Sequence, residues 1–193
     1  MSSSKKISPF ALSKQIEKTN SKLAKKFLKN LIKNKKKIFI NKNNKIYTGE
    51  NLLKKIILFS NKFFLNKNKI LILNSKNSSN WVLLYISAKL MNKIVFVIND
   101  NINYEFLKNL NKEFSIIGIF QNDKLKINNE FKNLKNNYIF KDELIYDCIF
   151  TSGSSGYPKA VCIKENSYIF TSRLLINKSK QTKNDLELLS MPF

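Results

Sequence analysis

The residues best suited to chemistry lie close together near position 155. The stretch reads Thr151, Ser152, Gly153, Ser154, Ser155, Gly156, Tyr157, Pro158 and Lys159, and it holds three of the seven glycine and proline residues in the chain. Glycine lets backbone N–H groups turn towards an anion, hydroxyl groups add further donors, and lysine adds a full positive charge. The stretch therefore predicts a phosphate-binding loop. A Ser/Gly-rich surface turn is the alternative, but it does not explain why proline and lysine follow.

The stretch is not a Walker A loop, because two residues separate Gly156 from Lys159. From Phe150 to Lys159 it resembles the Tyr/Phe-Thr-Ser-Gly-Ser/Thr-Thr/Ser-Gly-x-Pro-Lys-Gly signature of the adenylate-forming superfamily. That family includes acyl-CoA synthetases, peptide-synthetase adenylation domains and luciferases. Every specified position up to the lysine is matched.

Weaker resemblances to the same family extend over residues 38–193. Lys45–Thr48 resembles its early "Leu-Thr-Tyr-x-Glu-Leu" entry to a helix, and 70–74 followed by 80–82 resembles a strand and the "Asn-Ser-x-Glu-Phe/Trp-Val" helix start. Residues 94–99 are similar to the strand that ends in "Val-Pro-Leu/Ile-Asn". Only the stretch near position 155 is diagnostic.

Three positions depart from the family pattern. Val97 stands where proline is usual, Ala160 where glycine is usual, and Glu165 near a frequent histidine. The end of the chain resembles the start of a "Leu-Pro-Leu/Met-Phe-His" strand, but Phe193 is the last residue. The resemblance therefore leads us to expect a partial domain that ends within the family's N-terminal part.

The resemblance implies an ATP-dependent carboxylate ligase that forms an acyl-adenylate and then transfers the acyl group to coenzyme A or another thiol. Donors from Thr151 to Gly156 would hold the β- and γ-phosphates of ATP, Lys159 would neutralise them, and Mg²⁺ would bridge them. The family's later motifs and its catalytic lysine lie outside this sequence. We therefore assign no catalytic residue or metal ligand, and expect the isolated chain to be inactive without a downstream domain or subunit.

The elements around this stretch alternate between short apolar runs and helical patterns. We expect a hairpin from 37–40 and 45–48, a helix over 50–65 capped by Thr48, and a second helix over 80–91 between apolar strands at 70–73 and 94–98. Further expected elements are a helix at 104–112, strands at 116–120, 138–140, 147–150 and 186–193, and a polar stretch up to 137. This order predicts an α/β fold with a doubly wound, mainly parallel sheet and flanking helices, and its last strand predicts open apolar edges and association.

We divide the chain into two parts. Residues 1–37 form a basic N-terminal segment, and residues 38–193 form the partial AMP-binding domain. Apolar residues recur at helical spacing in the segment: Leu12, Ile16, Leu23, Phe27, Leu28, Leu31 and Ile32. They predict one amphipathic helix. It is either a peripheral helix docked on the domain or an anchor whose lysines contact an anionic membrane surface.

The formal net charge is +22, from 35 basic and 13 acidic residues. Such an excess suggests an anionic partner. However, Arg173 is the only arginine, whereas nucleic-acid surfaces favour arginine. Lys, Asn, Ile and Phe share AT-rich codons, so coding bias explains much of the charge. We expect no specific nucleic-acid partner, and retain a basic nucleic-acid-binding module and a non-catalytic nucleotide- or partner-binding remnant as alternatives.

Two cysteines flank the 151–159 stretch, and the chain has no histidine. Cys148 and Cys162 have no metal-ligand spacing, so we interpret both as small core residues. No apolar run approaches the ~20 residues of a membrane-spanning helix, and the N-terminus lacks the features of a secretory signal. These observations predict a cytoplasmic protein.

Overall fold

The computed structural model describes residues 14, 16–42, 45–64, 66, 69–74, 78–99, 104–128, 145–151, 158–182 and 185. The helices are α2 (Lys22–Lys33), α3 (Gly49–Phe64), α4 (Ser79–Leu90), α5 (Tyr104–Glu113) and α6 (Glu165–Ser179). The strands are β1 (Ile38–Lys42), β2 (Lys45–Thr48), β3 (Ile70–Asn74), β4 (Ile94–Ile98), β5 (Ile116–Gln121), β6 (Lys124–Ile127), β7 (Ile145–Thr151) and β8 (Lys159–Lys164).

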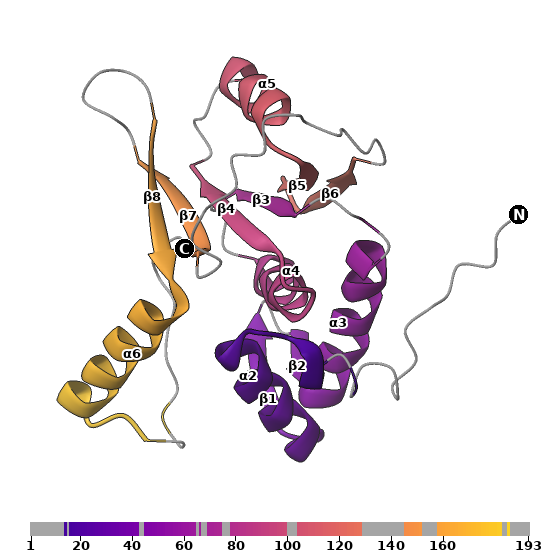
Figure 1. Ribbon diagram of the computed structural model, residues 1–193. Helices are drawn as coiled ribbons and strands as arrows, with labels where there is room; N and C mark the ends of the chain where they lie inside the picture. Colours follow the sequence, from indigo (N-terminus) through magenta and orange to yellow (C-terminus); the bar gives the residue numbers. More distant parts are fainter. Residues whose placement is uncertain are drawn as a thin grey trace, which may run out of the picture.

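Six strands form the main sheet in the order β6-β5-β3-β4-β7-β8. The four inner strands are parallel to one another, and β6 and β8 are antiparallel strands at the two edges. The connection from β3 to β4 runs through α4 on one face, and the connection from β4 to β5 runs through α5 on the other (Figure 1). The prediction of a doubly wound, mainly parallel sheet with flanking helices is confirmed.

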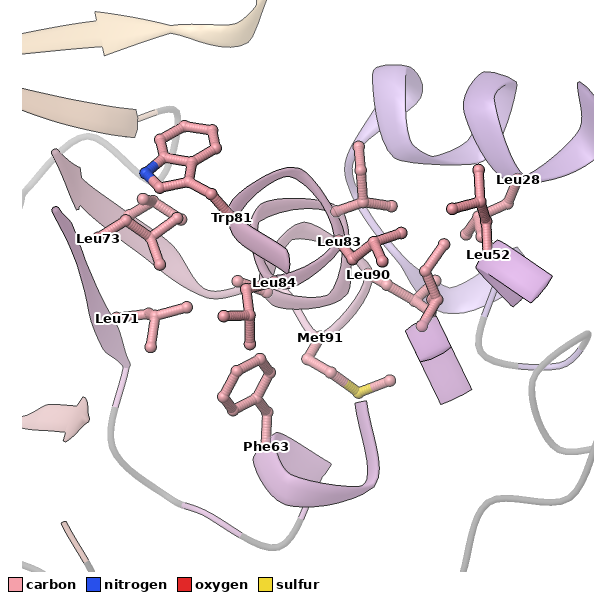
Figure 2. Close-up of a cluster of buried hydrophobic side chains, with 14 of the residues drawn as sticks. Leu28, Leu52, Phe63, Leu71, Leu73, Trp81, Leu83, Leu84, Leu90 and Met91 are labelled. Atoms are coloured by element: carbon pink, nitrogen blue, oxygen red, sulfur yellow. The ribbon is translucent and has the colours of Figure 1, made fainter. Parts of the chain in front are cut away.

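The apolar run of β3 packs on both faces of the sheet, as the lack of polar alternation predicted. Leu71 and Leu73 belong to the cluster beneath α4, which Figure 2 shows, whereas Ile70 and Ile72 belong to a second cluster on the α5 side. Burying each such side chain stabilises the fold by about 1.5 to 3 kcal/mol. The centre of the sheet is therefore held from both sides.

A two-stranded hairpin of β1 and β2 leads into α3, as predicted. The backbone N–H of Thr48 donates to the side-chain oxygen of Asn51, and the N–H of Asn51 donates back to the Thr48 hydroxyl, which confirms the predicted cap. The helix begins at Gly49, where an added Cβ would lie 2.7 Å from the carbonyl oxygen of Asn34. Glycine is required there because the start of α3 approaches the end of α2 so closely.

The basic segment is not one continuous helix, so that prediction was wrong. A first helical stretch ends before Thr19, whose hydroxyl donates to the carbonyl of Lys89, and Ser21 then caps α2. Leu28 and Leu31 join the core, whereas Ile32 is 43% exposed. Leu12 lies outside the described residues. The helix α2 is docked on the domain, as the peripheral-helix interpretation expected.

Three described elements were missed by the sequence prediction. Strand β6 falls within the stretch expected to be irregular, and β8 and α6 were not predicted. The predicted strands at 138–140 and 186–193 lie outside the described residues, so the structure does not test them. Within the described ranges no helix is long and apolar enough to cross a membrane.

Candidate functional site

The 151–159 stretch connects the last two strands of the sheet. Strand β7 runs parallel to β4, and β8 returns antiparallel beside it with Thr151 opposite Lys159. The Thr151 hydroxyl donates to the carbonyl oxygen of Lys159 at 3.4 Å. The structure therefore brings the first and last predicted site residues together. The others, Ser152, Gly153, Ser154, Ser155 and Gly156, lie outside the described residues.

This connection begins at the carboxyl end of a parallel strand, which is where open α/β sheets bind ligands. Both Thr151 and Lys159 are exposed there, so the lysine charge is open to a ligand. Asn74 ends β3 at the same edge of the sheet and is 2% exposed. Its side-chain carbonyl oxygen has no hydrogen-bond partner among the residues that the structure describes. The edge thus offers an exposed cation and an exposed hydroxyl, whereas the Asn74 amide oxygen is buried.

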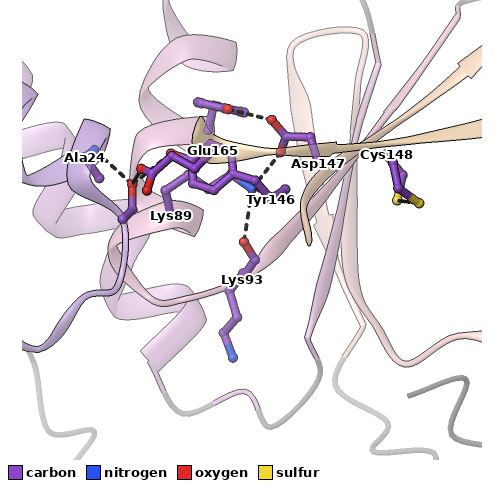
Figure 3. A network of polar contacts seen from close by, with 10 residues as sticks. Ala24, Lys89, Lys93, Tyr146, Asp147, Cys148 and Glu165 are labelled. Atoms are coloured by element: carbon purple, nitrogen blue, oxygen red, sulfur yellow. Dashed lines mark hydrogen bonds and ion pairs between the residues drawn. The ribbon is translucent and has the colours of Figure 1, made fainter. Parts of the chain in front are cut away.

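A buried ion pair between Lys89 on α4 and Asp147 near the start of β7 joins the two elements (Figure 3). The Lys89 Nζ atom lies 2.6 Å from Asp147 Oδ1, and both side chains are 1% exposed. The hydroxyl of Tyr85 donates to the other carboxylate oxygen at 2.6 Å, and Lys89 also donates to the carbonyl of Tyr146. The Lys89 ammonium lies 4.0 Å from the centre of the Tyr146 ring. Charge, hydrogen bonds and a cation–π contact therefore fix the start of the strand that ends at Thr151.

The electrostatics of this cluster follow from its burial. Burial lowers the pKa of Lys89 from its ordinary value, although Asp147 acts in the opposite direction. Burial raises the pKa of Tyr85, and the adjacent Asp147 carboxylate raises it further. Burial also raises the pKa of Tyr146. The tyrosines therefore stay protonated at neutral pH and serve as hydrogen-bond donors rather than as acids or bases.

A second contact joins the start of α6 to the start of α2. One carboxylate oxygen of Glu165 accepts hydrogen bonds from the Ser21 hydroxyl and from the backbone N–H of Leu23, each at 2.8 Å. The Ser21 hydroxyl also lies 2.8 Å from the Tyr146 hydroxyl. Glu165, which stands near a frequent histidine of the family pattern, thus has a structural role at a helix N-terminus.

Sequence reasoning missed both Lys89 and Asp147. The signal was only partial: a lone lysine within an apolar helix and a lone aspartate within an apolar strand indicate that each charge is buried with a partner, but not that the two pair with each other. The two cysteines have different environments. Cys148 is 1% exposed, as predicted, but Cys162 is exposed on the edge strand β8, so its assignment to the core was wrong. Over the described ranges, no group of three or more His, Cys, Asp or Glu side chains could hold a metal ion.

Neither a known family profile nor a curated protein sequence matches this chain. Solved structures do match its fold. O-succinylbenzoate coenzyme A synthetase (MenE) from Bacillus subtilis, in complex with AMP, has a TM-score of 0.64 and 13% sequence identity, over 86% of this chain and 49% of that one. A protein assigned as a long-chain-fatty-acid CoA ligase from Rhodopseudomonas palustris has a TM-score of 0.65 and 11% identity, over 90% and 52%. Apo MatB from Rhodopseudomonas palustris has a TM-score of 0.62 and 11% identity, over 86% and 40%.

This chain therefore spans about half the length of these solved structures, or less. The shared part includes the mainly parallel sheet and its flanking helices. From this likeness we conclude that the chain has the fold of the adenylate-forming acid and acyl-CoA ligases, the superfamily that its 150–159 stretch resembles.

Proposed function

We propose that this chain is the N-terminal part of an ATP-dependent ligase that activates a carboxylic acid as an acyl-adenylate and contributes the triphosphate-binding loop. The observation that carries the proposal is the pairing of Thr151 with Lys159 at the carboxyl end of β7. It supports a loop whose two ends are fixed by strand pairing, and the serines and glycines between them are residue types suited to binding an anion.

In the proposed reaction, the substrate carboxylate attacks the α-phosphorus of ATP and pyrophosphate leaves. Negative charge grows on the leaving pyrophosphate, so the Lys159 ammonium and the hydroxyl and backbone donors of the loop stabilise it. Mg²⁺ would enter with the phosphates. The nearest buried carboxylate, Asp147, is already paired with Lys89, so we assign no protein ligand to the metal. Transfer of the acyl group from the adenylate to coenzyme A, or to another thiol, belongs to the same proposal.

A direct test is ATP binding to the purified 193-residue chain by isothermal titration calorimetry in the presence of Mg²⁺. A charge-assisted contact to phosphate is worth about 1.5 to 3 kcal/mol, so Lys159→Ala should weaken binding at least tenfold. Lys164→Ala removes the same charge at the other end of β8 and is the matched control. It should change the affinity less than twofold.

Equal losses in the two variants would show that ATP responds only to the net charge, and would overturn the proposed loop. Turnover is a separate readout. We expect no carboxylate-dependent pyrophosphate release from the isolated chain, because the remaining family motifs lie outside it. Release that Lys159→Ala abolishes would contradict this expected inactivity while supporting the role of the loop.

A further inference from the structure

The two cysteines of the chain face each other across the hairpin that carries the 151–159 stretch. Cys148 on β7 is directly opposite Cys162 on β8 in the strand register. Their sulfur atoms are 3.2 Å apart (Figure 3 labels Cys148). Directly opposed residues of antiparallel strands have neighbouring Cβ atoms, and a disulfide joins sulfurs at about 2.0 Å. Only a small movement of the two side chains separates the thiol pair from a bond.

The position of this pair relative to the loop is symmetrical. Cys148 precedes Thr151 by three residues, and Cys162 follows Lys159 by three. A bond between the cysteines would therefore close a ring around the whole stretch. From the register and the sulfur distance, we propose that Cys148 and Cys162 are a redox modification site, at which a reversible disulfide locks the β7–β8 hairpin.

The two thiols differ in a way that orders the chemistry. Cys162 is exposed and can meet a small oxidant, whereas Cys148 is buried at 1% exposure. With glutathione disulfide as oxidant, the Cys162 thiolate attacks one of its sulfurs, forms a mixed disulfide and releases one glutathione thiolate. The Cys148 thiol then loses its proton to solvent and attacks the Cys162 sulfur, which releases the second glutathione. Two protein thiols are oxidised and one glutathione disulfide is reduced to two glutathiones.

The second step should be the slower one. Burial raises the pKa of the Cys148 thiol, and so do its hydrogen bond with Cys162 and the nearby Asp147 carboxylate, whereas Lys89 acts in the opposite direction. Little Cys148 thiolate is therefore present at neutral pH, although the attacked sulfur lies within contact distance. Proximity compensates for this, because the step is intramolecular.

The test incubates the reduced chain with glutathione disulfide and follows intact mass. The wild-type chain should lose about 2 Da and both titratable thiols, with no stable adduct. Cys148→Ser should stop at the mixed disulfide, about 305 Da heavier, because its resolving thiol is missing. Cys162→Ser should remain unmodified, because Cys148 is buried. Cys148→Ala repeats the first variant if serine in the core prevents folding.

Two outcomes would overturn the proposal. One is a wild-type chain that stops at the glutathione adduct, as Cys148→Ser should. The other is a disulfide between two chains rather than within one, seen by non-reducing electrophoresis and peptide mapping. Either result would mean that the 3.2 Å contact is only a contact between two thiols.

The effect on the hairpin is measured by hydrogen exchange. A cross-link that closes a ring of about 15 residues restricts the open states, so β8 amides should exchange roughly tenfold more slowly in the oxidised chain. Chains with both cysteines replaced by serine should exchange identically with and without oxidant. Equal β8 exchange in oxidised and reduced wild type would show that the bond does not lock the hairpin.

The effect of the Cys148–Cys162 disulfide on ATP binding rests on the proposed function. Because a fixed hairpin loses less freedom on binding, the oxidised chain should bind ATP about threefold more tightly than the reduced one. A disulfide without ATP binding in either state would refute the proposed function and leave the redox site in place. ATP binding without a disulfide would refute the redox site alone.

Discussion

Helices α4 and α6 are similar in length but differ completely in their surroundings. Eight of the twelve residues of α4 are buried, whereas none of the fifteen residues of α6 is. Yet α6 also carries large apolar side chains, with Phe170 65% exposed and Leu175 60% exposed. The difference shows that apolar side chains alone do not bury a helix. Burial also requires a neighbouring sheet or helix against which these side chains can pack.

The surroundings of each helix follow from its place in the sheet. Helix α4 crosses between two central strands and lies between the sheet and α3, whereas α6 follows the edge strand β8 (Figure 1). Near its N-terminal end α6 contacts the rest of the molecule through Glu165 and through Tyr168, whose ring lies 6.0 Å from that of Tyr146. The remaining turns leave their apolar side chains in solvent.

The largest effect should come from breaking the pair that joins α4 to β7. Asp147→Asn leaves the buried Lys89 ammonium without its counter-charge, which costs about 3 to 5 kcal/mol of unfolding free energy. Urea denaturation followed by Trp81 fluorescence measures the loss. The double variant Lys89→Met with Asp147→Leu removes both charges and should recover most of the stability. A double variant as unstable as the single one would show that the pair itself, not the orphaned charge, matters.

Matched leucine substitutions test the comparison of the helices directly. Leu84→Ala on α4 removes a fully buried side chain and should cost about 2 to 5 kcal/mol. Leu175→Ala on α6 makes the same chemical change at an exposed site and should stay within about 0.5 kcal/mol. The same urea titration measures both. A large loss for Leu175→Ala would mean that α6 is covered in solution, for example by a second copy of the chain.

The stability of the chain as a function of pH tests the electrostatic environment of Lys93, which follows α4. Burial lowers the pKa of Lys93 to about 8, with a further contribution from Lys69. Between pH 8 and about 10.4 the unfolded chain keeps this proton and the folded chain loses it, so stability due to Lys93 rises with pH. The rise should be about 1 to 2 kcal/mol after allowance for solvent screening.

Comparison with Lys93→Met isolates this contribution from the other groups that titrate in the same range. The wild-type chain should gain stability relative to the variant as the pH increases from 7.5 to 10. A difference in urea midpoint that stays constant with pH would contradict the lowered pKa of Lys93.

The smallest effect concerns the contact of α6 with α2. Glu165→Gln keeps the size of the side chain but removes the charge at the N-terminus of α2, and should cost about 1 kcal/mol. Glu50→Gln is the matched control, since Glu50 is exposed and paired with Lys54 in solvent. It should leave the urea midpoint unchanged. If both variants behave alike, the Glu165 contact does not anchor α6.

The parts of the fold that sequence predicted are those with a strong local signal. The apolar runs at 70–73 and 94–98 allow few structures other than buried parallel strands, and the amphipathic pattern of α3 is similarly clear. Helix α6 has no such pattern, because its apolar residues are distributed around its surface. Strand β6 alternates lysine with apolar residues, but it lies within a polar, lysine-rich stretch that favoured an irregular interpretation.

The candidate site shows the same division. The 151–159 stretch was predicted as a site from its residue types, their spacing and its resemblance to a family signature, because a motif that is continuous in sequence can be read without a structure. The pairing of Lys89 with Asp147 joins residues 58 positions apart, and the contact of Glu165 with Ser21 joins residues 144 apart. One sequence without structure does not specify such pairings, since each depends on how the strands are ordered.

The strand register also has a consequence for the order of folding. The pairing of Ile149 with Val161 closes a separation of 12 residues, whereas the pairing of Val95 with Asp147 closes one of 52. The longer closure costs about 1.3 kcal/mol more in chain entropy. We therefore expect the β7–β8 hairpin to form early and then to dock on β4 in a slower, later step.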